Sequence, residues 1–302
     1  MHPITYEDII PIETFLDYNN EEIQQFCITH DIRTCYLPVD GTRRHFILFS
    51  SSVNDWEEKH LDSYYHHVNE KFREIIRQFY DYGIKNLIIL LMDESAFSRG
   101  KAFLSETIKN GIKPMYEDQE YLDLYEKYNI DVQFAGFTSV FEEYYDKNIL
   151  IELETHFKAL NRESAERTLV VYTGLSPSKD YLLLENYSQN LRKENIEVNR
   201  ENLVKKIYGT DLSTIDFTIW FSYPRDKIIP PLLWENGTNI YIKNPTLTLT
   251  SKQIKRAIYY TALTKRSIKD KYFYHKFTEQ EKLTIQNEIL SSDSIMGPEY
   301  YY

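Results

Sequence analysis

Cysteine is scarce in this sequence, since Cys27 and Cys35 are the only two among 302 residues. Two thiols cannot build a disulfide framework or a zinc site with four thiolate ligands. An excess of basic residues is also missing, because the formal net charge is −11 at pH 7. Nucleic acids and anionic membranes attract basic surfaces, so this charge argues against a nucleic-acid partner.

Long apolar segments are absent as well. The N-terminal stretch MHPITYEDII has neither a basic region nor an apolar core, so it does not resemble a signal peptide. The longest dense apolar run, Leu87 to Met92, is far too short to span a bilayer. We therefore expect a cytoplasmic protein with no stable membrane insertion.

Several common motifs are missing too. No GxGxxG follows an expected strand and no GxxxxGK[ST] occurs, which disfavours dinucleotide and P-loop nucleotide binding. No GxSxG elbow is present, which disfavours the common hydrolases. His66 and His67 are neighbours on an expected helix, where adjacent side chains point apart, so they cannot share one metal ion.

Strand-like and helix-like segments alternate along the rest of the chain. Short apolar runs predict strands at 33–39, 86–92, 131–137, 168–174, 216–222 and 238–244. Helical patterns lie at 56–82, 98–110, 118–129, 140–161, 180–194, 200–208 and 250–266. This alternation predicts one α/β domain over 1–302, with a mostly parallel six-stranded sheet and helices on both faces. We expect a peripheral C-terminal helix and tail over 278–302.

Ligands of such sheets bind beyond the carboxyl ends of the strands, and polar clusters occur there at 40–44, 93–95 and 222–227. In the first cluster, DGTRR, Gly41 permits a tight turn that brings backbone N–H groups to an anion. Arg43 and Arg44 supply forked donors that match phosphate oxygens. Asp40 could hold Mg²⁺ or act as an acid or base. The spacing alone equally allows a surface turn in which Asp40 pairs with either arginine.

The aromatic content, 15% with 26 tyrosines, leaves two interpretations open. In the first, compositional bias supplies tyrosines to the core; in the second, some of them line a pocket for an apolar or cationic species.

The string Leu-Pro-Val-Asp-Gly-Thr-Arg-Arg at 37–44 resembles the diphosphate-binding motif of the cis-prenyltransferases, such as undecaprenyl diphosphate synthase. It is most similar to the tuberculosinol synthase (tuberculosinyl adenosine transferase) branch of that superfamily. MDESAFSRG at 92–100, EYLDLYEKYNIDVQFAG at 120–136 and IWFSYPRDKIIPPLLW at 219–234 resemble further segments of the branch, in the same order.

This resemblance implies a role for each matching residue. Asp40 would be the essential acid and the ligand of Mg²⁺. The diphosphate would bind to Gly41, Thr42, Arg43, Arg44 and Arg225. Tyr64 matches a functional tyrosine, with Tyr65 as the near alternative, and Asp93 and Glu94 match the acidic loop. We expect a prenyl diphosphate substrate of C15–C20 and a homodimer.

Departures from the superfamily pattern bear on the reaction. Chain-elongating members bind isopentenyl diphosphate through an arginine pair, and Trp220 takes the place of the first of these arginines. A glutamate that helps to hold Mg²⁺ falls at about Asn239 or Ile240. The resemblance therefore favours a terpene synthase-type enzyme that ionises an allylic diphosphate and releases diphosphate. Its product would be cyclised, deprotonated or captured by a nucleophile. The alternatives are a chain-elongating cis-prenyltransferase and a non-catalytic prenyltransferase subunit.

Overall fold

A computed structural model describes residues 10–49, 60–136, 140–141, 143, 145–162, 164–176, 179–221 and 229–269. At its centre is one six-stranded sheet in the order β3-β4-β2-β1-β5-β6, and every neighbouring pair is parallel. The strands are β1 (Thr34–Pro38), β2 (Asn86–Asp93), β3 (Ile130–Gly136), β4 (Arg167–Leu175), β5 (Phe217–Phe221) and β6 (Thr238–Ile242). The six predicted strands are confirmed, each within two residues of its expected ends.

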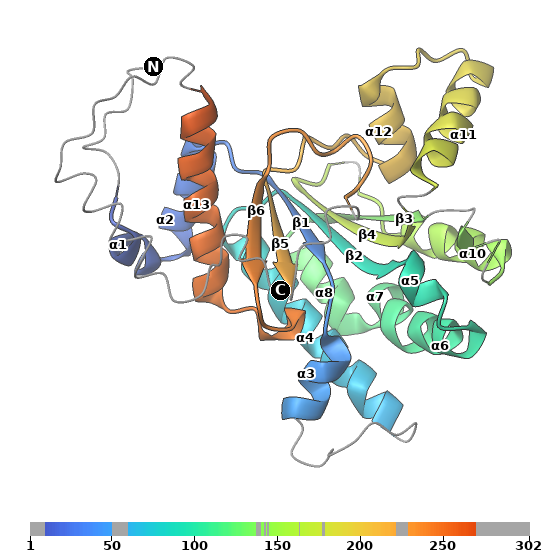
Figure 1. The fold of residues 1–302 in the computed structure, drawn as a ribbon, viewed down its shortest axis with the longest axis horizontal. Helices are drawn as coiled ribbons and strands as arrows, with labels where there is room; N and C mark the ends of the chain where they lie inside the picture. The colour runs from blue at the N-terminus through green and yellow to red at the C-terminus, as the bar shows by residue number, and fades with distance from the viewer. Residues whose placement is uncertain are drawn as a thin grey trace, which may run out of the picture.

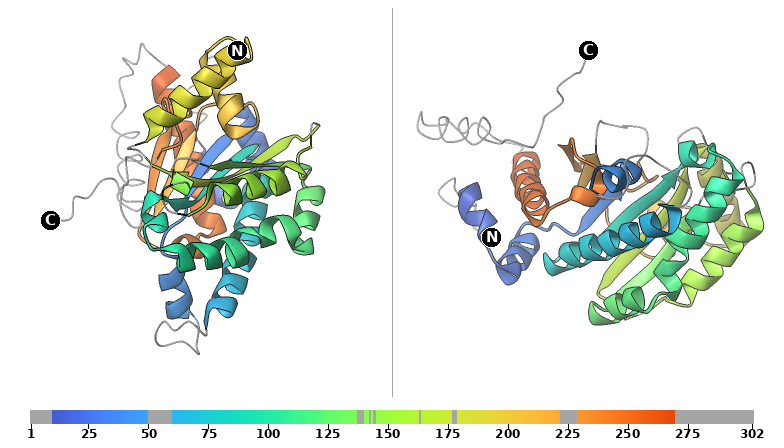
Figure 2. Two further views of the ribbon diagram at one scale, coloured as in Figure 1. Left: turned by 90° about the vertical axis from the view of Figure 1, so that its right-hand side faces the viewer. Right: turned by 90° about the horizontal axis from the view of Figure 1, so that it is seen from below.

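Helices lie on both sides of this sheet (Figures 1 and 2). The longer ones are α2 (Asn20–Thr29), α4 (Leu61–Asp81), α8 (Gln119–Lys127), α10 (Lys147–Lys158), α11 (Asp180–Lys193), α12 (Arg200–Tyr208) and α13 (Ser251–Lys269). In Figure 1, α4 and α8 lie below the sheet, whereas α11 and α12 lie above it. The expected α/β architecture is confirmed. None of the helices in the described ranges is both long and apolar enough to cross a bilayer.

Helix α4 shows why the sequence folds as it does. Val68, Phe72, Ile75, Ile76 and Phe79 recur at three- and four-residue steps, and all five are buried. The helix ends at Asp81, and Gly83 follows with φ 83°, a backbone conformation that favours glycine. The first five residues of the helix predicted over 56–82 have no counterpart in α4, and four of them, 56–59, lie outside the described residues.

The prediction of one continuous helix over 98–110 was wrong, although most of this region is helical. Two elements occupy this region, α6 (Lys101–Glu106) and the π-helix η3 (Thr107–Ile112), and the short helix α5 (Glu94–Phe97) precedes it. Gly100 separates α5 from α6 because its φ of 100° cannot continue a helix. A short helix α7 (Pro114–Glu117) follows.

Some elements near the N-terminus and before α13 were not predicted. They are α1 (Ile12–Leu16), α2 and the 3-10 helix η4 (Thr246–Thr248). Asn19 begins α2 with a capping box that Glu22 completes. Lys255 of α13 donates to the carbonyls of Leu16 and Tyr18, which ties α13 to this N-terminal pair of helices. The predicted tail over 278–302 lies outside the described residues.

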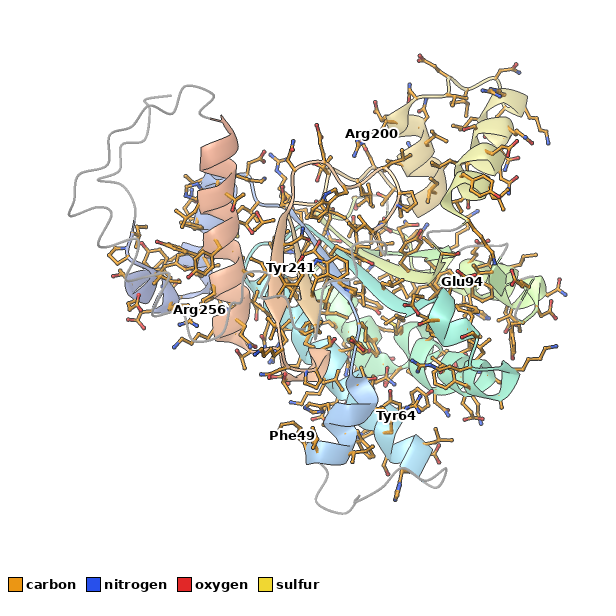
Figure 3. All side chains as sticks on the ribbon, viewed as in Figure 1. Phe49, Tyr64, Glu94, Arg200, Tyr241 and Arg256 are labelled. Carbon is orange, nitrogen blue, oxygen red and sulfur yellow. The ribbon has the colours of Figure 1, made fainter. Side chains whose placement is uncertain are left out.

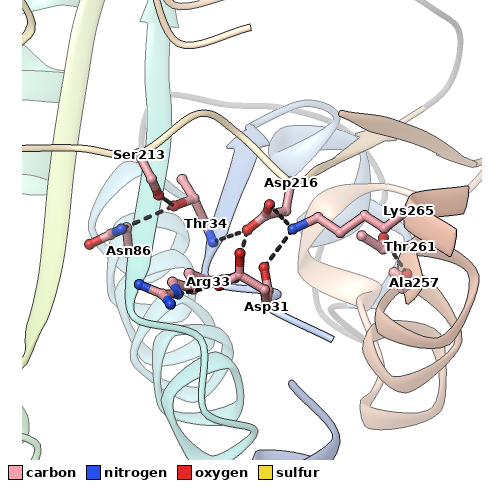
Figure 4. Close-up of polar contacts among 9 residues, drawn as sticks. All are labelled: Asp31, Arg33, Thr34, Asn86, Ser213, Asp216, Ala257, Thr261 and Lys265. Atoms are coloured by element: carbon pink, nitrogen blue, oxygen red, sulfur yellow. Dashed lines mark hydrogen bonds and ion pairs between the residues drawn. The ribbon is translucent and has the colours of Figure 1, made fainter. Parts of the chain in front are cut away.

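A polar cluster anchors the amino ends of the central strands (Figure 4). The Asp216 carboxylate accepts hydrogen bonds from the backbone N–H groups of Arg33 (2.6 Å) and Thr34 (2.8 Å), and it pairs with Lys265 of α13. These contacts fix β1, β5 and α13 at the edge of the sheet opposite the carboxyl ends of the strands. They leave the carboxyl ends as the place for a ligand.

Candidate active site

A cleft opens where the carboxyl ends of β1, β2 and β5 meet. Its volume is about 450 Å³, which is within the usual range for small-molecule sites. Leu90 and Met92 of β2 and Phe221 of β5 give it an apolar wall, while Asp40 and Arg43 bring polar groups to it. This location is the one that the sequence predicted for the first two polar clusters.

The turn that carries Asp40 is fixed by a distant part of the chain. The Asp40 backbone N–H donates to Thr246 Oγ1 (2.8 Å), and the Asp40 carbonyl accepts from both the N–H and the hydroxyl of Thr246 (3.0 Å each). Gly41 follows with φ 71°, a left-handed conformation that is strained for residues with a Cβ atom. Thr246 and Gly41 together hold the Asp40 backbone at the cleft.

The helix α3 (Thr42–Phe49) begins directly after this turn. The sequence predicted only a turn here, because no expected helix covered RRHFILF. The first N–H groups of a helix have no partners inside it, and the helix dipole makes this end attractive to anions. Thr42 and Arg43 line the cleft from the first turn of α3, so this end of the helix faces the cleft. Arg44 is in the same turn, and its side chain lies outside the described part of the structure.

A second arginine, Arg99, also lines the cleft, and its role was not predicted from the sequence. The guanidinium carbon of Arg43 lies 5.6 Å from the centre of the Phe103 ring, and that of Arg99 lies 5.1 Å from it. Two cations that converge on one aromatic ring form a favourable site for a multiply charged anion. The sequence signal for a role of Arg99 was its place near the end of the MDESAFSRG segment, which resembles a segment of the cis-prenyltransferase branch.

The structure separates the two tyrosines that the sequence left as alternatives. The hydroxyl of Tyr64 lies 2.7 Å from that of Thr42, next to the Asp40 turn. The hydroxyl of Tyr65 lies 2.8 Å from that of Thr107 in η3. Burial raises the pKa of Tyr64 above its ordinary value of 10.0, against opposing effects of the Thr42 bond and the nearby Arg43 and Arg99. Tyr64 is therefore a neutral phenol at neutral pH, able to donate a proton in a hydrogen bond.

Asp93 and Glu94 are neighbours in sequence but point to different places. Asp93 lines the cleft and caps α5, where its carboxylate accepts from Ala96 N–H (3.0 Å) and the Ser95 hydroxyl (2.6 Å). Glu94 is not among the described residues that line the cleft. Its carboxylate accepts from the Ser176 hydroxyl (2.5 Å) and pairs with Lys179 (3.1 Å). Figure 3 shows Glu94 at the start of α5 and Tyr64 in α4, close to α3.

Trp220, which is buried in β5, also lines the cleft. Its indole N–H donates to Asn239 Oδ1 of β6 at 2.7 Å. Its ring packs edge-on against Tyr36 of β1, with 6.1 Å between the centroids. This side chain therefore offers the cleft an aromatic surface. Arg225, which the resemblance placed nearby, lies outside the described residues.

A magnesium ion fits this set of residues only together with a ligand. Within the described ranges, no three His, Cys, Asp or Glu side chains are grouped so that they could hold a metal ion. Asp40 and Asp93 both line the cleft. Mg²⁺ is commonly held by one or two carboxylates plus substrate phosphates and water, so these two carboxylates would satisfy that pattern once a phosphate-bearing ligand is bound.

No family model matches this sequence, and no curated protein matches it either. Solved structures do share its fold. One is a probable undecaprenyl diphosphate synthase from Campylobacter jejuni, with a TM-score of 0.53 and 14% identity over 82% of this chain and 98% of that one. Another is lavandulyl diphosphate synthase from Lavandula x intermedia in complex with dimethylallyl diphosphate. Its TM-score is 0.55, with 13% identity over 78% of this chain and 96% of that one. The sheet and helices described above are thus the fold of these two diphosphate synthases.

Proposed function

We propose that this protein acts on a prenyl diphosphate, as a terpene synthase-type enzyme related to the tuberculosinol synthase branch of the cis-prenyltransferases. The observation that carries the proposal is the convergence of Arg43 and Arg99 on Phe103, next to the Asp40 turn and in front of an apolar wall. This arrangement provides an anion site at one end of the cleft and a hydrocarbon site beside it. Both fold neighbours are named for the synthesis of prenyl diphosphates, which supports the same substrate class.

In the proposed reaction, the allylic carbon–oxygen bond breaks and its electrons leave with the diphosphate. Arg43, Arg99 and the N–H groups that begin α3 would stabilise the negative charge that develops there. Arg44 would add to this stabilisation, as the resemblance implies. Asp40, with Asp93 nearby, would hold Mg²⁺, which when bound adds positive charge on the leaving oxygens. Arg225 would bind the same diphosphate, as the resemblance implies.

The other product of bond cleavage is an allylic cation, and the cleft presents aromatic rings to it. Trp220, Tyr64 and Tyr65 line the cleft, and aromatic faces attract cations. The neutral Tyr64 hydroxyl lies on the diphosphate side, where it would donate a hydrogen bond to the leaving group. Glu94 is held by Ser176 and Lys179 away from the cleft lining, so Asp93 is the better candidate of the two for removing a proton.

Chain elongation is the second candidate, because the names of both fold neighbours describe diphosphate synthesis. It requires a second anion site for isopentenyl diphosphate, and charge-assisted bonds from arginine are the usual means of building one. At the expected position Trp220 gives its single N–H to Asn239. Among the described residues that line the cleft, the cationic side chains are Arg43 and Arg99, both on the α3–α6 side. These observations favour the terpene synthase-type reaction. A non-catalytic subunit is disfavoured because it needs no such anion site.

The proposal is tested by incubating the purified protein with geranyl, farnesyl and geranylgeranyl diphosphate in the presence of Mg²⁺. We expect diphosphate release and an extractable terpene product by gas chromatography–mass spectrometry, best with C15 or C20 substrates. Asp40→Asn is the matched control, since it removes one charge and little volume. Loss of such a group typically lowers the rate by about 10² to 10⁴. No release with any substrate, or more than a tenth of the activity in Asp40→Asn, would contradict the assignment.

A further inference from the structure

Two side chains that lie outside the cleft lining hold the indole of Trp220. The indole N–H donates to Oδ1 of Asn239 at 2.7 Å, and the ring packs edge-on against Tyr36 with 6.1 Å between the centroids. Trp220 lines the cleft, whereas neither Asn239 nor Tyr36 is among the described residues that line it. Both partners therefore hold the indole from behind the surface that a ligand would meet.

The register of the sheet explains how one side chain reaches both partners. Thr218 pairs with Tyr36 of β1 on one side and with Asn239 of β6 on the other. Residues two apart on a strand point to the same face, so Trp220 projects from the same face as Thr218 and these two partners. Since Trp220 contacts both partners, its indole leans back along β5 and lies between them. Two neighbouring strands thus fix the orientation of this one ring.

The part of Trp220 that the cleft meets is carbon. The indole N–H is the only polar group of the side chain, and it is directed to Asn239. A buried N–H without an acceptor is costly, and Trp220 is 3% exposed. Without Asn239 the ring would therefore turn to find another acceptor. Tyr36 is fully buried and occupies the side toward β1, so we expect the N–H to turn toward the cleft, where water or a phosphate oxygen can accept it.

This carbon surface lies next to the turn that carries Asp40. Trp220 is two residues beyond the paired position Thr218, which places it level with Pro38 of β1 because parallel strands advance together. Pro38 ends β1, Asp40 follows two residues later, and both also line the cleft. In the proposed reaction the allylic carbon is attached to the diphosphate bound at this turn. A cation formed at that carbon would thus lie close to Trp220.

We propose that Asn239 is a positioning residue that turns the N–H of Trp220 away from the cleft, so that this surface favours a hydrocarbon cation over water or a second anion. The inference rests on the proposed function, since the cation is the one formed from the prenyl diphosphate. An aromatic face attracts a cation, whereas an N–H directed into the cleft is a donor for water and phosphate oxygens. Asn239 is exposed on β6 and is not among the described residues that line the cleft, so it acts through the orientation of Trp220.

The first measurement follows the indole N–H directly. Each of the three tryptophans of the chain gives one indole signal in the ¹H–¹⁵N spectrum of protein labelled with ¹⁵N-tryptophan, and the signal of Trp220 is the one missing in Trp220→Phe. We expect its proton shift to move upfield in Asn239→Leu, which has no acceptor. The shift should stay near its wild-type position in Asn239→Asp, which keeps one. An unmoved signal in Asn239→Leu would overturn the inference.

The second measurement is binding of a mimic of the cation. N,N-dimethyl amines with farnesyl and geranylgeranyl chains, whose protonated nitrogen resembles the allylic cation, are titrated calorimetrically in the presence of inorganic diphosphate. In Asn239→Leu we expect the affinity for the amine that the wild type prefers to fall about three- to thirtyfold, the range that follows from cation–aromatic attraction. Asn239→Asp should bind it no more weakly than the wild type. Asn236→Leu, the same change at an exposed position before β6, should match the wild type.

Inorganic diphosphate alone separates the ways in which the idea can fail. It should bind the wild type and Asn239→Leu equally, because the change touches neither Arg43 nor Arg99. If the wild type bound neither diphosphate nor an amine, both the proposed function and this inference would be overturned. If the wild type bound diphosphate but no amine, or if Asn239→Leu bound the amine as well as the wild type does, only the inference would be overturned.

A double-mutant cycle distinguishes positioning from a merely structural role. In a Trp220→Phe background no N–H remains to be oriented, so adding Asn239→Leu should not change the affinity for the amine further. An equal loss in that background would show that Asn239 acts without Trp220 and would overturn the inference. Should Asn239→Leu fail to fold by circular dichroism, Asn239→Ala, which also lacks the acceptor, decides by the same measurements.

Discussion

Thr246 offers a sharp test of how the fold positions Asp40, because it lies 206 residues away in the sequence and contacts the Asp40 backbone directly. Thr246→Val keeps the shape of the side chain but removes its hydroxyl. The Asp40 N–H then loses an acceptor at 2.8 Å, and the Asp40 carbonyl loses one of two donors while the Thr246 N–H remains. Thr246 is fully buried, so water cannot easily replace the lost partner. A buried donor without its acceptor costs about 1–3 kcal/mol.

We therefore expect Thr246→Val to lower the free energy of unfolding by about 1–3 kcal/mol in urea titrations. A shift of the Asp40 turn should also lower kcat for diphosphate release by roughly tenfold or more, since displacements of about 1 Å can cost about 10²-fold. Thr248→Val is the matched control. The Thr248 hydroxyl belongs to the same short helix but donates to the Pro245 carbonyl at 2.7 Å. Thr248→Val should therefore lower the free energy of unfolding and leave kcat unchanged. Wild-type kcat and KM in a folded Thr246→Val protein would refute the positioning role.

Three further changes probe the site and its support. Arg99→Ala should lower kcat and raise KM for a prenyl diphosphate, because the guanidinium binds the leaving group more strongly as its charge grows; a change in KM alone would limit Arg99 to substrate binding. Tyr64→Phe removes only the hydroxyl bonded to Thr42 and should slow diphosphate release or alter the products, whereas unchanged rate and products would rule out its role. The third concerns His45, whose ring stacks on His67 and whose pKa is lowered by burial from its ordinary 6.5 to about 4. The unfolded chain takes up this proton near pH 6.5 but the folded chain only near pH 4, so stability should fall as pH is lowered through this interval. The slope per histidine is at most about 1.4 kcal/mol per pH unit. It should be smaller in His45→Phe by urea unfolding at pH 4–7.

The sheet was predictable from the sequence because its strands are short apolar runs separated by helical patterns. Asn86 to Met92 is buried on both faces, and such runs are characteristic of parallel sheets. The location of the cleft followed as well, since polar residues after β1 and β2 had to meet at the carboxyl edge. The helix boundaries between Ser98 and Lys113 did not follow. A π-helix differs from an α-helix in its hydrogen-bond partners, and no apolar period distinguishes the two.

The arrangement inside the site was less predictable, because it depends on contacts between distant segments. Asp93 and Glu94 looked equivalent in sequence, and the N-cap of α5 is what directs the Asp93 carboxylate back to Ala96 while Glu94 turns to Ser176. Asn239 meets Trp220 only through the register of β5 and β6, which pairs Thr218 with Asn239. The Glu94–Ser176 and Trp220–Asn239 contacts have no signal in local spacing, because their partners are far apart in the sequence.

We propose above that this cleft ionises a prenyl diphosphate without joining it to a second one. The most direct test is to supply radiolabelled isopentenyl diphosphate together with geranyl, farnesyl or geranylgeranyl diphosphate and Mg²⁺. Released diphosphate and label in longer prenyl chains are then measured in the same reactions. We expect the allylic substrate to be consumed and diphosphate to be released while no label enters longer chains. Label incorporated into longer chains at a rate comparable to diphosphate release would contradict it and establish chain elongation instead.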